Sequence, residues 1–377
     1  MSRAFPFDVE LSPRDLKAFK RDGVVCLRHV IDAEEIKALR TDVAQQMVGL
    51  KQSSTAYDFE DLARQVWTPD GGVAAGNIDV GKADRFDISD LQMILDYDEA
   101  ARPIRELSER NASETLSANG DGKFFYDAAG WRFYEGIRSV ALDSSLPSLT
   151  AQLLESTTLN FWEDTTFVKA PLTPQRTTFH QDYGYFQISG SKCCIVWIPL
   201  DPVTEETGSM EYIRGSHHWQ EAYAPNVLIS QSSHPLSPFD RLPDIEANRS
   251  DYDIISFDVE PGDVIIHHVM TVHGSRGNMS KNQVRRAVSL RYCGDDIVYC
   301  DRPGAMVQPY LIDKPDEGAP LYSKDYPLVW PRVFPSAKLS SVFKDEKLEG
   351  ELVKVSTFTP SDKPKTWEQS KRPEAVT

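Results

Sequence analysis

The sequence predicts a mainly β protein with flanking helices, folded as a double-sheet jelly roll or barrel. Between residues 121 and 295, short runs of Val, Ile, Phe, Tyr and Trp alternate with Gly, Pro and Asp turns, which is typical of such folds. The first fifty residues instead carry the capping residues and the periodicity of helices. A chain of 377 residues can bury a large core of this kind.

The N-terminal region is expected to form a helix, a strand and a second helix. Ser12 is a suitable N-cap and Pro13 suits the first helical position. Residues 22–23 (Asp-Gly) end that helix, and the apolar run 24–27 predicts a short strand. An acidic cap then opens a second amphipathic helix over 32–47.

The rest of the predicted sheet structure lies further along the chain. Short apolar runs bounded by turn residues predict strands at 124–126, 166–168, 194–198, 263–266 and 288–292. We expect one domain over 1–355, with the N-terminal helices packed on one outer face.

Two segments lack the pattern of regular structure. Residues 51–90 are irregular and contain Gly and Pro turn signals, so they are expected to form a long loop, either an active-site lid or a plain surface insertion. Residues 356–377 are polar and interrupted by Lys-Pro and Arg-Pro, which predicts a disordered tail.

Composition narrows the function classes. With 41 basic and 57 acidic residues the formal net charge is −16, which argues against a nucleic-acid-binding face. No apolar stretch is long enough to span a membrane, and the chain start has no hydrophobic signal core. An odd number of cysteines, five, favours reduced thiols in a cytoplasmic protein. A small-molecule substrate is the expected partner, and the oligomeric state is left open.

A possible metal site is split along the chain. Of the eight histidines, only His180 is followed two positions later by a carboxylate, that of Asp182, and His273 lies nearly a hundred residues beyond. Alternate residues of a strand share a face, so His180 and Asp182 can converge on one ion. A hydrogen-bonded pair at a strand end is the alternative. Two imidazoles and one carboxylate predict a mononuclear non-haem Fe(II) oxygenase, in which the open metal face receives a cosubstrate and O2.

Other histidines are expected to have lesser roles. His217 and His218 are interpreted as lying outside the iron ligands. His267 and His268 follow an apolar run, and we expect His268 to belong to the core or to orient a metal-bound side chain.

Several segments, in the same order, resemble the phytanoyl-CoA dioxygenase family, which includes ectoine hydroxylase. They are 19–25, 31–36, 179–182, 208–211, 214–219, 261–264, 273–275, 278 and 285–287. The resemblance implies a double-stranded β-helix (a cupin-like jelly roll), with Fe(II), and 2-oxoglutarate and O2 as cosubstrates. It also implies that His180, Asp182 and His273 are the iron ligands.

The resemblance extends to the cosubstrate pocket. Arg285 resembles the arginine that holds the distal carboxylate of 2-oxoglutarate, a role that suits a charged, bidentate guanidinium. Its neighbour Arg286 is the alternative. Ser275 and Trp197 resemble further cosubstrate-binding positions, and Trp197 is equally compatible with an ordinary core residue. Asn278 is expected to fix the loop after His273.

The resemblance implies an Fe(II)- and 2-oxoglutarate-dependent dioxygenase that hydroxylates a C–H bond of a small organic substrate and releases succinate and CO2. Desaturation or another oxidative outcome is left open. The carboxylate of Asp182 argues against a halogenase, which needs a vacant metal position there. Two alternatives are a jelly-roll protein that binds or regulates without catalysis, and a cupin-like metalloenzyme that does not use 2-oxoglutarate.

The substrate itself is not predicted. Contacts are expected from the possible lid and from residues 121–140. The candidate side chains in the second segment are Tyr126, Trp131, Arg132 and Tyr134, and core or surface positions are the alternative for all four.

Overall fold

The computed structural model describes residues 9–49, 57–58, 124–331 and 339–342, with gaps inside the third range at 220, 227, 229–232, 235, 307, 309–310 and 312. Apart from the strand residues Tyr57–Asp58, the expected lid at 51–90 lies outside these ranges, as does the expected tail at 356–377.

Two antiparallel sheets form the body of the protein. The strands of the larger sheet are β1 (Val24–Leu27), β2 (Tyr57–Asp58), β3 (Phe124–Ala128), β4 (Leu159–Lys169), β7 (Cys193–Pro199), β10 (Val264–His268), β12 (Arg285–Gly294) and β14 (Leu328–Trp330). Their order is β1-β10-β7-β12-β4-β3-β2, with β14 beside β4. Strands β5 (Thr177–His180), β8 (Met210–Ile213), β9 (Ile254–Ser256) and β11 (His273–Ser275) form the smaller sheet in the order β5-β11-β8-β9. A short pair joins β6 (Ile188–Ser189) to β13 (Val298–Tyr299).

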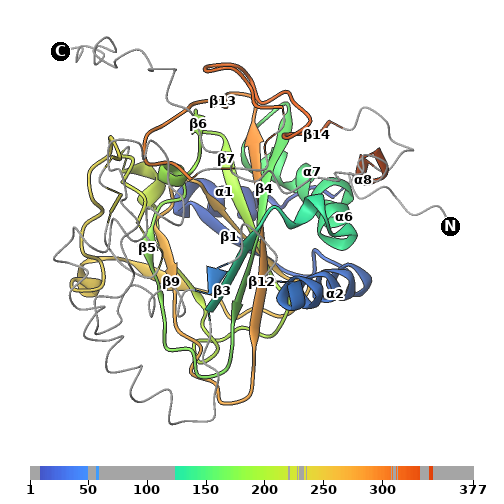
Figure 1. Cartoon of the computed structure of the whole chain (residues 1–377). Helices are drawn as coiled ribbons and strands as arrows, with labels where there is room; N and C mark the ends of the chain where they lie inside the picture. Colours follow the sequence, from blue (N-terminus) through green and yellow to red (C-terminus); the bar gives the residue numbers. More distant parts are fainter. Residues whose placement is uncertain are drawn as a thin grey trace, which may run out of the picture.

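Helices cover one face of the larger sheet. The α-helices are α1 (Pro13–Asp22), α2 (Ala33–Gly49), α6 (Glu135–Asp143), α7 (Leu146–Leu153) and α8 (Leu339–Val342). The 3-10 turns are η4 (Gly130–Arg132), η5 (Tyr183–Tyr185), η6 (Ser216–His218) and η7 (Arg249–Asp251). Figure 1 shows α2, α6, α7 and α8 on one side of the larger sheet, with β5 and β9 on the other.

The first helix begins and ends where its sequence predicts. The Ser12 side chain accepts a hydrogen bond from the Asp15 amide at 3.1 Å, and Pro13 follows it. Gly23 ends the helix with a φ of 75°, and its amide donates to the Phe19 carbonyl at 2.8 Å. Strand β1 then starts at once.

The second helix starts with a capping box. The Asp32 carboxylate accepts from the Glu35 amide at 2.8 Å, and the Glu35 carboxylate accepts from the Asp32 amide at 3.0 Å. This reciprocal pair satisfies two amides that no helical carbonyl can reach.

The central strands of the larger sheet are buried on both faces. Every residue of β7 is buried, because helices cover one face and the smaller sheet covers the other. In β7, β10 and β12, even-numbered apolar residues pack in the core shared with α2, α6 and α7. Odd-numbered residues of the same strands face the space between the two sheets. That space contains the candidate site.

Candidate metal centre

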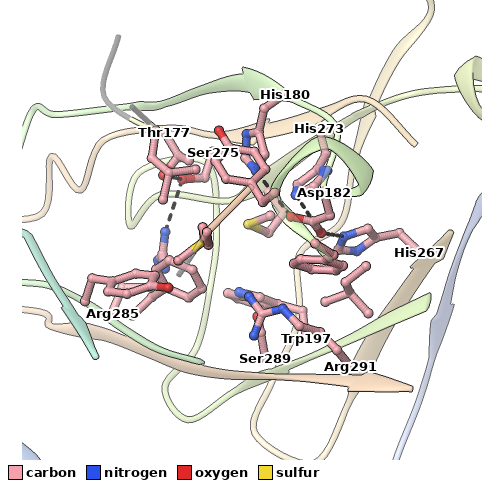
Figure 2. Close-up of a pocket in the computed structure, with 18 residues that line it drawn as sticks. Thr177, His180, Asp182, Trp197, His267, His273, Ser275, Arg285, Ser289 and Arg291 are labelled. Carbon is pink, nitrogen blue, oxygen red and sulfur yellow. Dashed lines mark hydrogen bonds and ion pairs between the residues drawn. The ribbon is translucent and has the colours of Figure 1, made fainter. Parts of the chain in front are cut away.

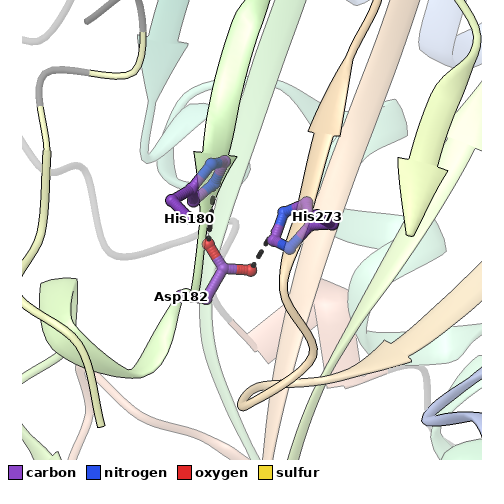
Figure 3. A group of neighbouring side chains, drawn as sticks. All are labelled: His180, Asp182 and His273. Atoms are coloured by element: carbon purple, nitrogen blue, oxygen red, sulfur yellow. Dashed lines mark ion pairs between the residues drawn. The ribbon is translucent and has the colours of Figure 1, made fainter. Parts of the chain in front are cut away.

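The predicted iron ligands come together from two neighbouring strands and one turn. His180 ends β5 and His273 begins β11, and these two residues are direct partners across the antiparallel pair. Asp182 lies beyond the strand, with φ −71° and ψ −27°, at the start of η5 (Figure 3). The expectation that strand alternation aligns His180 with Asp182 is therefore wrong. A turn after His180 brings the carboxylate back towards both imidazoles.

The strand pair that holds the histidines requires a close backbone approach. A Cβ atom on Gly274 would lie 2.7 Å from the Thr177 carbonyl oxygen and 3.3 Å from the Phe179 amide nitrogen. Glycine at this position therefore lets β11 approach β5 closely enough to bring His273 beside His180.

The three side chains form a compact, buried group of ligand atoms. Asp182 Oδ1 lies 3.7 Å from His180 Nε2, and Asp182 Oδ2 lies 3.8 Å from His273 Nε2. One ligand atom from each residue lies within 4.8 Å of the others. Metal–nitrogen and metal–oxygen bonds of about 2.0–2.2 Å place ligand atoms roughly 3–3.5 Å apart, so a small contraction would fit one ion. The donor set suits a divalent transition metal with an open face.

Backbone hydrogen bonds orient both imidazoles for coordination. His180 Nδ1 lies 2.7 Å from the Thr178 carbonyl oxygen, and His273 Nδ1 lies 2.9 Å from the Thr271 carbonyl oxygen. A carbonyl can only accept, so Nδ1 carries the proton and Nε2 presents a lone pair. Burial, with the neighbouring imidazoles, lowers the pKa of both His180 and His273 to about 4. The two rings are therefore neutral at pH 7.

A third imidazole touches the carboxylate. His267 Nε2 lies 3.3 Å from Asp182 Oδ2, and its ring is buried between Tyr212 and His273. Burial raises the pKa of Asp182, but His273, His267 and His180 more than offset that effect, so its net pKa is below the usual value. The carboxylate is thus ionised and its orientation is restrained by His267.

These residues lie at one side of a cavity between the two sheets (Figure 2). Its lining residues are Tyr126, Phe167, Thr177, His180, Asp182, Tyr185, Phe186, Ile195, Trp197, Met210, Leu228, His267, His273, Ser275, Arg285, Ser289, Arg291 and Met306. Trp197, Ser275 and Arg285, all predicted from the sequence, are among them.

Arg285 is buried without an ionic partner in the described part of the chain. Its side chain is 1% exposed, and one terminal nitrogen donates to Ser275 Oγ at 3.3 Å. The guanidinium carbon lies 5.6 Å from the centre of the Trp197 ring, and its Nε atom has no hydrogen-bond partner. Burial lowers the pKa of Arg285 to about 10, which leaves it charged at neutral pH. Arg285 is therefore a buried cation with no described carboxylate beside it.

Arg286 faces the other side of the sheet. Its guanidinium pairs with both oxygens of Asp201, at 2.9 and 2.6 Å, and its amide donates to the same carboxylate. Arg286 is therefore already neutralised and does not line the cavity.

Of the four side chains proposed from the sequence as substrate contacts, one lines the cavity and three do not. Tyr126 lines the cavity. Trp131 packs edge-on against Phe161 in the core on the helix side of the sheet, Arg132 pairs with Asp325 at 2.6 Å, and Tyr134 packs against the same core. The last three do not line the cavity and lie in or against the core, which is the alternative expected for them.

Several cavity residues were not predicted. His267, rather than His268, contacts Asp182, because odd-numbered residues of β10 face between the sheets. His268 instead accepts from the Met270 amide and lies near His217. Arg291 follows Arg285 on the same face of β12, a spacing that strand alternation could have revealed.

Lys169 is a further unpredicted residue beside the cavity. It is fully buried, and Nζ donates to Ser275 Oγ at 2.9 Å and to the Arg276 carbonyl at 2.8 Å. Burial and the charge of Arg285 hold the pKa of Lys169 well below its usual value. Asn278, as expected, fixes the loop after His273 through hydrogen bonds to the Lys169 and Gln283 carbonyls.

Two facing antiparallel sheets with two histidines and one carboxylate between them form a candidate site of the kind typical of mononuclear non-haem iron proteins. A model of the family described as "Phytanoyl-CoA dioxygenase (PhyH)" matches residues 19–287. The chain belongs to the phytanoyl-CoA dioxygenase family, as its sequence motifs led us to expect.

Curated relatives agree with this assignment. The chain is 24% identical over 123 residues to a probable phytanoyl-CoA dioxygenase of Caenorhabditis elegans, covering 32% of this chain and 38% of the relative. It is 24% identical over 130 residues to the peroxisomal phytanoyl-CoA dioxygenase of Homo sapiens, covering 34% and 37%. Phytanoyl-CoA dioxygenase 1 of Oryza sativa subsp. japonica is 21% identical over 74% of this chain and 88% of its own length. The chain thus spans less than two-fifths of the first two relatives.

Solved structures confirm the predicted mainly β, jelly-roll fold. The non-haem α-ketoglutarate-dependent carbocyclase SnoK from nogalamycin biosynthesis superposes with a TM-score of 0.53 at 19% identity, covering 87% of this chain and all of SnoK. The epimerase SnoN, solved with Fe3+, α-ketoglutarate and nogalamycin RO, gives 0.54 at 18% identity, with coverage of 84% and 97%. At these identities the likeness is one of fold.

No helix among the described residues is both long enough and apolar enough to cross a membrane.

Proposed function

We propose that the protein is an Fe(II)- and 2-oxoglutarate-dependent dioxygenase that hydroxylates, or otherwise oxidises, a C–H bond of a small organic molecule. The observation that carries this proposal is the arrangement of opposite charges in one cavity. The ionised carboxylate of Asp182 and the two neutral imidazoles lie on one side of the cavity. The guanidinium of Arg285, which has no described ionic partner, lies on another side.

The donor set assigns the metal ligands. His180, Asp182 and His273 would hold the ion, because their ligand atoms converge and the two Nε2 atoms carry free lone pairs. His267 would keep the Asp182 carboxylate in place by donating to Oδ2. Because all three protein ligands would occupy one face of the metal ion, the coordination positions on its opposite face would be open to cosubstrates.

Arg285 supports 2-oxoglutarate as the cosubstrate. A dicarboxylate that reaches the metal with one end would place its other carboxylate against this guanidinium, where Ser275 and Trp197 define the surroundings. A buried guanidinium favours binding of a bidentate carboxylate, because without an anion nothing offsets the free-energy cost of removing its charge from water. Lys169 would keep the Ser275 hydroxyl oriented.

When bound, Fe(II) with 2-oxoglutarate and O2 supplies the oxidation: one oxygen atom enters the substrate, the other enters succinate, and CO2 leaves. The chain itself contributes position and exclusion of water. Trp197 and Arg285 fix the cosubstrate end of the cavity, while Tyr126, Phe167 and Phe186 give it apolar walls.

Titration of the metal-free protein with Fe(II) under anaerobic conditions tests this proposal. Asp182→Ala should weaken iron binding by more than about 100-fold, since loss of a supporting contact alone costs about 10–100-fold. It should also abolish the visible band that 2-oxoglutarate produces with bound iron, and succinate release. Asp253→Asn, which alters a carboxylate that pairs with Arg214 on the surface, is the matched control and should retain all three. Unchanged iron affinity in Asp182→Ala would refute the ligand assignment.

We also propose a cytoplasmic location, which is supported by free thiols at all five cysteines. Cys193 and Cys293 lie on paired strands, and their sulfur atoms are 3.7 Å apart in a hydrogen bond and not joined by a disulfide, as a reducing compartment would keep them.

A further inference from the structure

One buried cation in the cavity is not used by iron or 2-oxoglutarate. Arg291 lies on β12, six residues beyond Arg285 on the same face, and its side chain is 6% exposed. Figure 2 shows Arg285 and Arg291 at different ends of the cavity, with Ser289 and Arg291 together below the metal ligands. A dicarboxylate that extends from the metal to Arg285 therefore leaves Arg291 free.

Arg291 has too few partners of its own. One terminal nitrogen donates to Thr165 Oγ1 at 2.5 Å, and the guanidinium lies 5.4 Å from the centre of the Phe186 ring. Its Nε atom is buried without a hydrogen-bond partner, and no described carboxylate forms an ion pair with it. Glu163 is its register partner on β4, but burial raises the pKa of Glu163 to about 7, so it is not a full countercharge.

The charges in the loaded cavity do not balance without another anion. The two positive charges of Fe(II) would be matched by the two carboxylates of 2-oxoglutarate, and Asp182 would match Arg285. Asp182 is the one acidic side chain among the described residues that line the cavity. The charge of Arg291 is then offset only in part, by the half-ionised carboxyl group of Glu163 on the neighbouring strand, in a space that has little water to screen it.

The apolar lining of the cavity defines the rest of the ligand. Phe186 lies beside the guanidinium, and Tyr126, Phe167, Leu228 and Met306 add apolar and aromatic surface to the same cavity. A ligand that fits this space has an apolar body and one anionic group.

We propose that the primary substrate is a monocarboxylic acid with an alkyl or aryl body, whose carboxylate binds Arg291 beside Ser289. The proposal rests on the proposed function, and it adds the substrate class. Binding at Arg291 would hold the carboxylate at one fixed place, so that a carbon of the apolar body faces the metal.

Paired acids and amides test the proposal. Protein loaded anaerobically with Fe(II) and 2-oxoglutarate is titrated with alkyl and aryl carboxylic acids, such as hexanoate and 3-phenylpropionate, and with the amide of each. Calorimetry and the change in the visible iron–cosubstrate band report binding. At least one acid should bind roughly ten- to a hundred-fold more tightly than its amide, the difference expected for a charge-assisted contact.

Variants then assign that preference to one residue. Arg291→Gln should abolish the preference for acids while leaving the 2-oxoglutarate requirement unchanged, and Arg291→Lys should retain part of it. Arg286→Gln lies on the same strand and is the matched control, because its side chain pairs with Asp201 outside the cavity. It should keep the full preference. Circular dichroism checks the folding of each variant, and Arg291→Lys decides the assignment should Arg291→Gln not fold.

Three outcomes would overturn the proposal and leave the proposed function intact: no acid in the set is preferred over its amide, the preference survives in Arg291→Gln, or Arg291→Gln raises the 2-oxoglutarate requirement as an Arg285 variant does. In the last case Arg291 holds the cosubstrate. Failure of the unaltered protein to bind Fe(II) and 2-oxoglutarate would instead refute the proposed function.

Discussion

Two adjacent arginines on β12 have opposite environments. Arg285 is buried against Trp197 with no carboxylate beside it, whereas Arg286 is clamped to both oxygens of Asp201. Neighbouring residues of a strand point to opposite faces, so a shift of one position along the chain exchanges these two environments. Only the residue on the inner face can meet a ligand between the sheets.

This difference predicts opposite effects of substitution. Arg285→Gln should raise the 2-oxoglutarate concentration needed for half-maximal succinate release by roughly 10- to 100-fold, because a buried carboxylate would lose a charged partner worth about 1.5–3 kcal/mol. Arg286→Gln should change it less than about three-fold. Steady-state kinetics with 2-oxoglutarate as the varied component measures both. The reverse order of effects would assign the cosubstrate contact to Arg286.

Single residues also show where sequence reasoning ends. The types and order of His180, Asp182 and His273 were enough to predict that the three side chains converge as a candidate metal site. The face that each strand residue occupies was not available from the sequence, since register depends on pairing with distant strands. His267 was therefore missed in favour of its neighbour His268.

At the scale of elements, helix α1 connects to the metal site through its C-terminal end. Gly23 has a φ of 75°, and its carbonyl accepts a hydrogen bond from Thr271 Oγ1 at 2.8 Å. The Thr271 carbonyl in turn fixes the His273 ring. A Cβ atom at position 23 would lie 2.5 Å from Thr271 Oγ1 and 2.4 Å from His217 Nδ1.

The two ends of α1 should therefore respond differently to substitution. Gly23→Ala should destabilise the fold by at least about 1–2 kcal/mol, the cost of a left-handed alanine, and should also weaken iron binding by displacing Thr271. Ser12→Ala removes the N-cap and should lower the free energy of unfolding by about 1 kcal/mol without changing the affinity for iron. Urea unfolding and iron titration of both variants provide the measurements. Equal iron affinity in the two variants would show that Gly23 does not influence the metal site through Thr271.

Helices and strands whose ends are marked by capping or turn residues in the sequence were predictable, and those without such residues were not. Helices α1 and α2 begin at capping residues, and strand β1 is a short apolar run. These signals depend only on residues close together in the sequence, so the structure matches the prediction there. Helices α6 and α7 lie in a region expected to be β-rich. Nearly every residue of α7 is buried, so it lacks the polar face that marks a helix in a sequence.

At the scale of the whole molecule, the space between the sheets and the core around it contain titratable groups whose pKa values are moved in opposite directions. Burial is the main cause of each shift. It lowers the pKa of His180, His273 and His268 to about 4. It raises the pKa of Glu163 and Asp164 to about 7. In each case the fold favours the neutral form.

These shifts predict that the metal-free protein loses stability as the pH falls from about 6.5 to about 4. In that range the three histidines bind protons in the unfolded chain but not in the fold, so acid favours unfolding. Glu163 and Asp164 act in the opposite sense, because the fold keeps their protons while the unfolded chain releases them. His217, whose pKa burial also lowers to about 4, adds a fourth histidine, so the histidines outnumber the two carboxyl groups and the net effect of acid is a loss of stability.

His267, whose pKa is also lowered by burial, adds to the loss of stability in acid. Thermal unfolding followed by circular dichroism, in the presence of a chelator, measures the effect at a series of pH values. His268→Gln removes one of these histidines without touching the proposed ligands and should make the decline shallower, because fewer groups then take up protons on unfolding. A melting temperature that stays level or rises on acidification would show that the buried carboxyl groups outweigh the histidines.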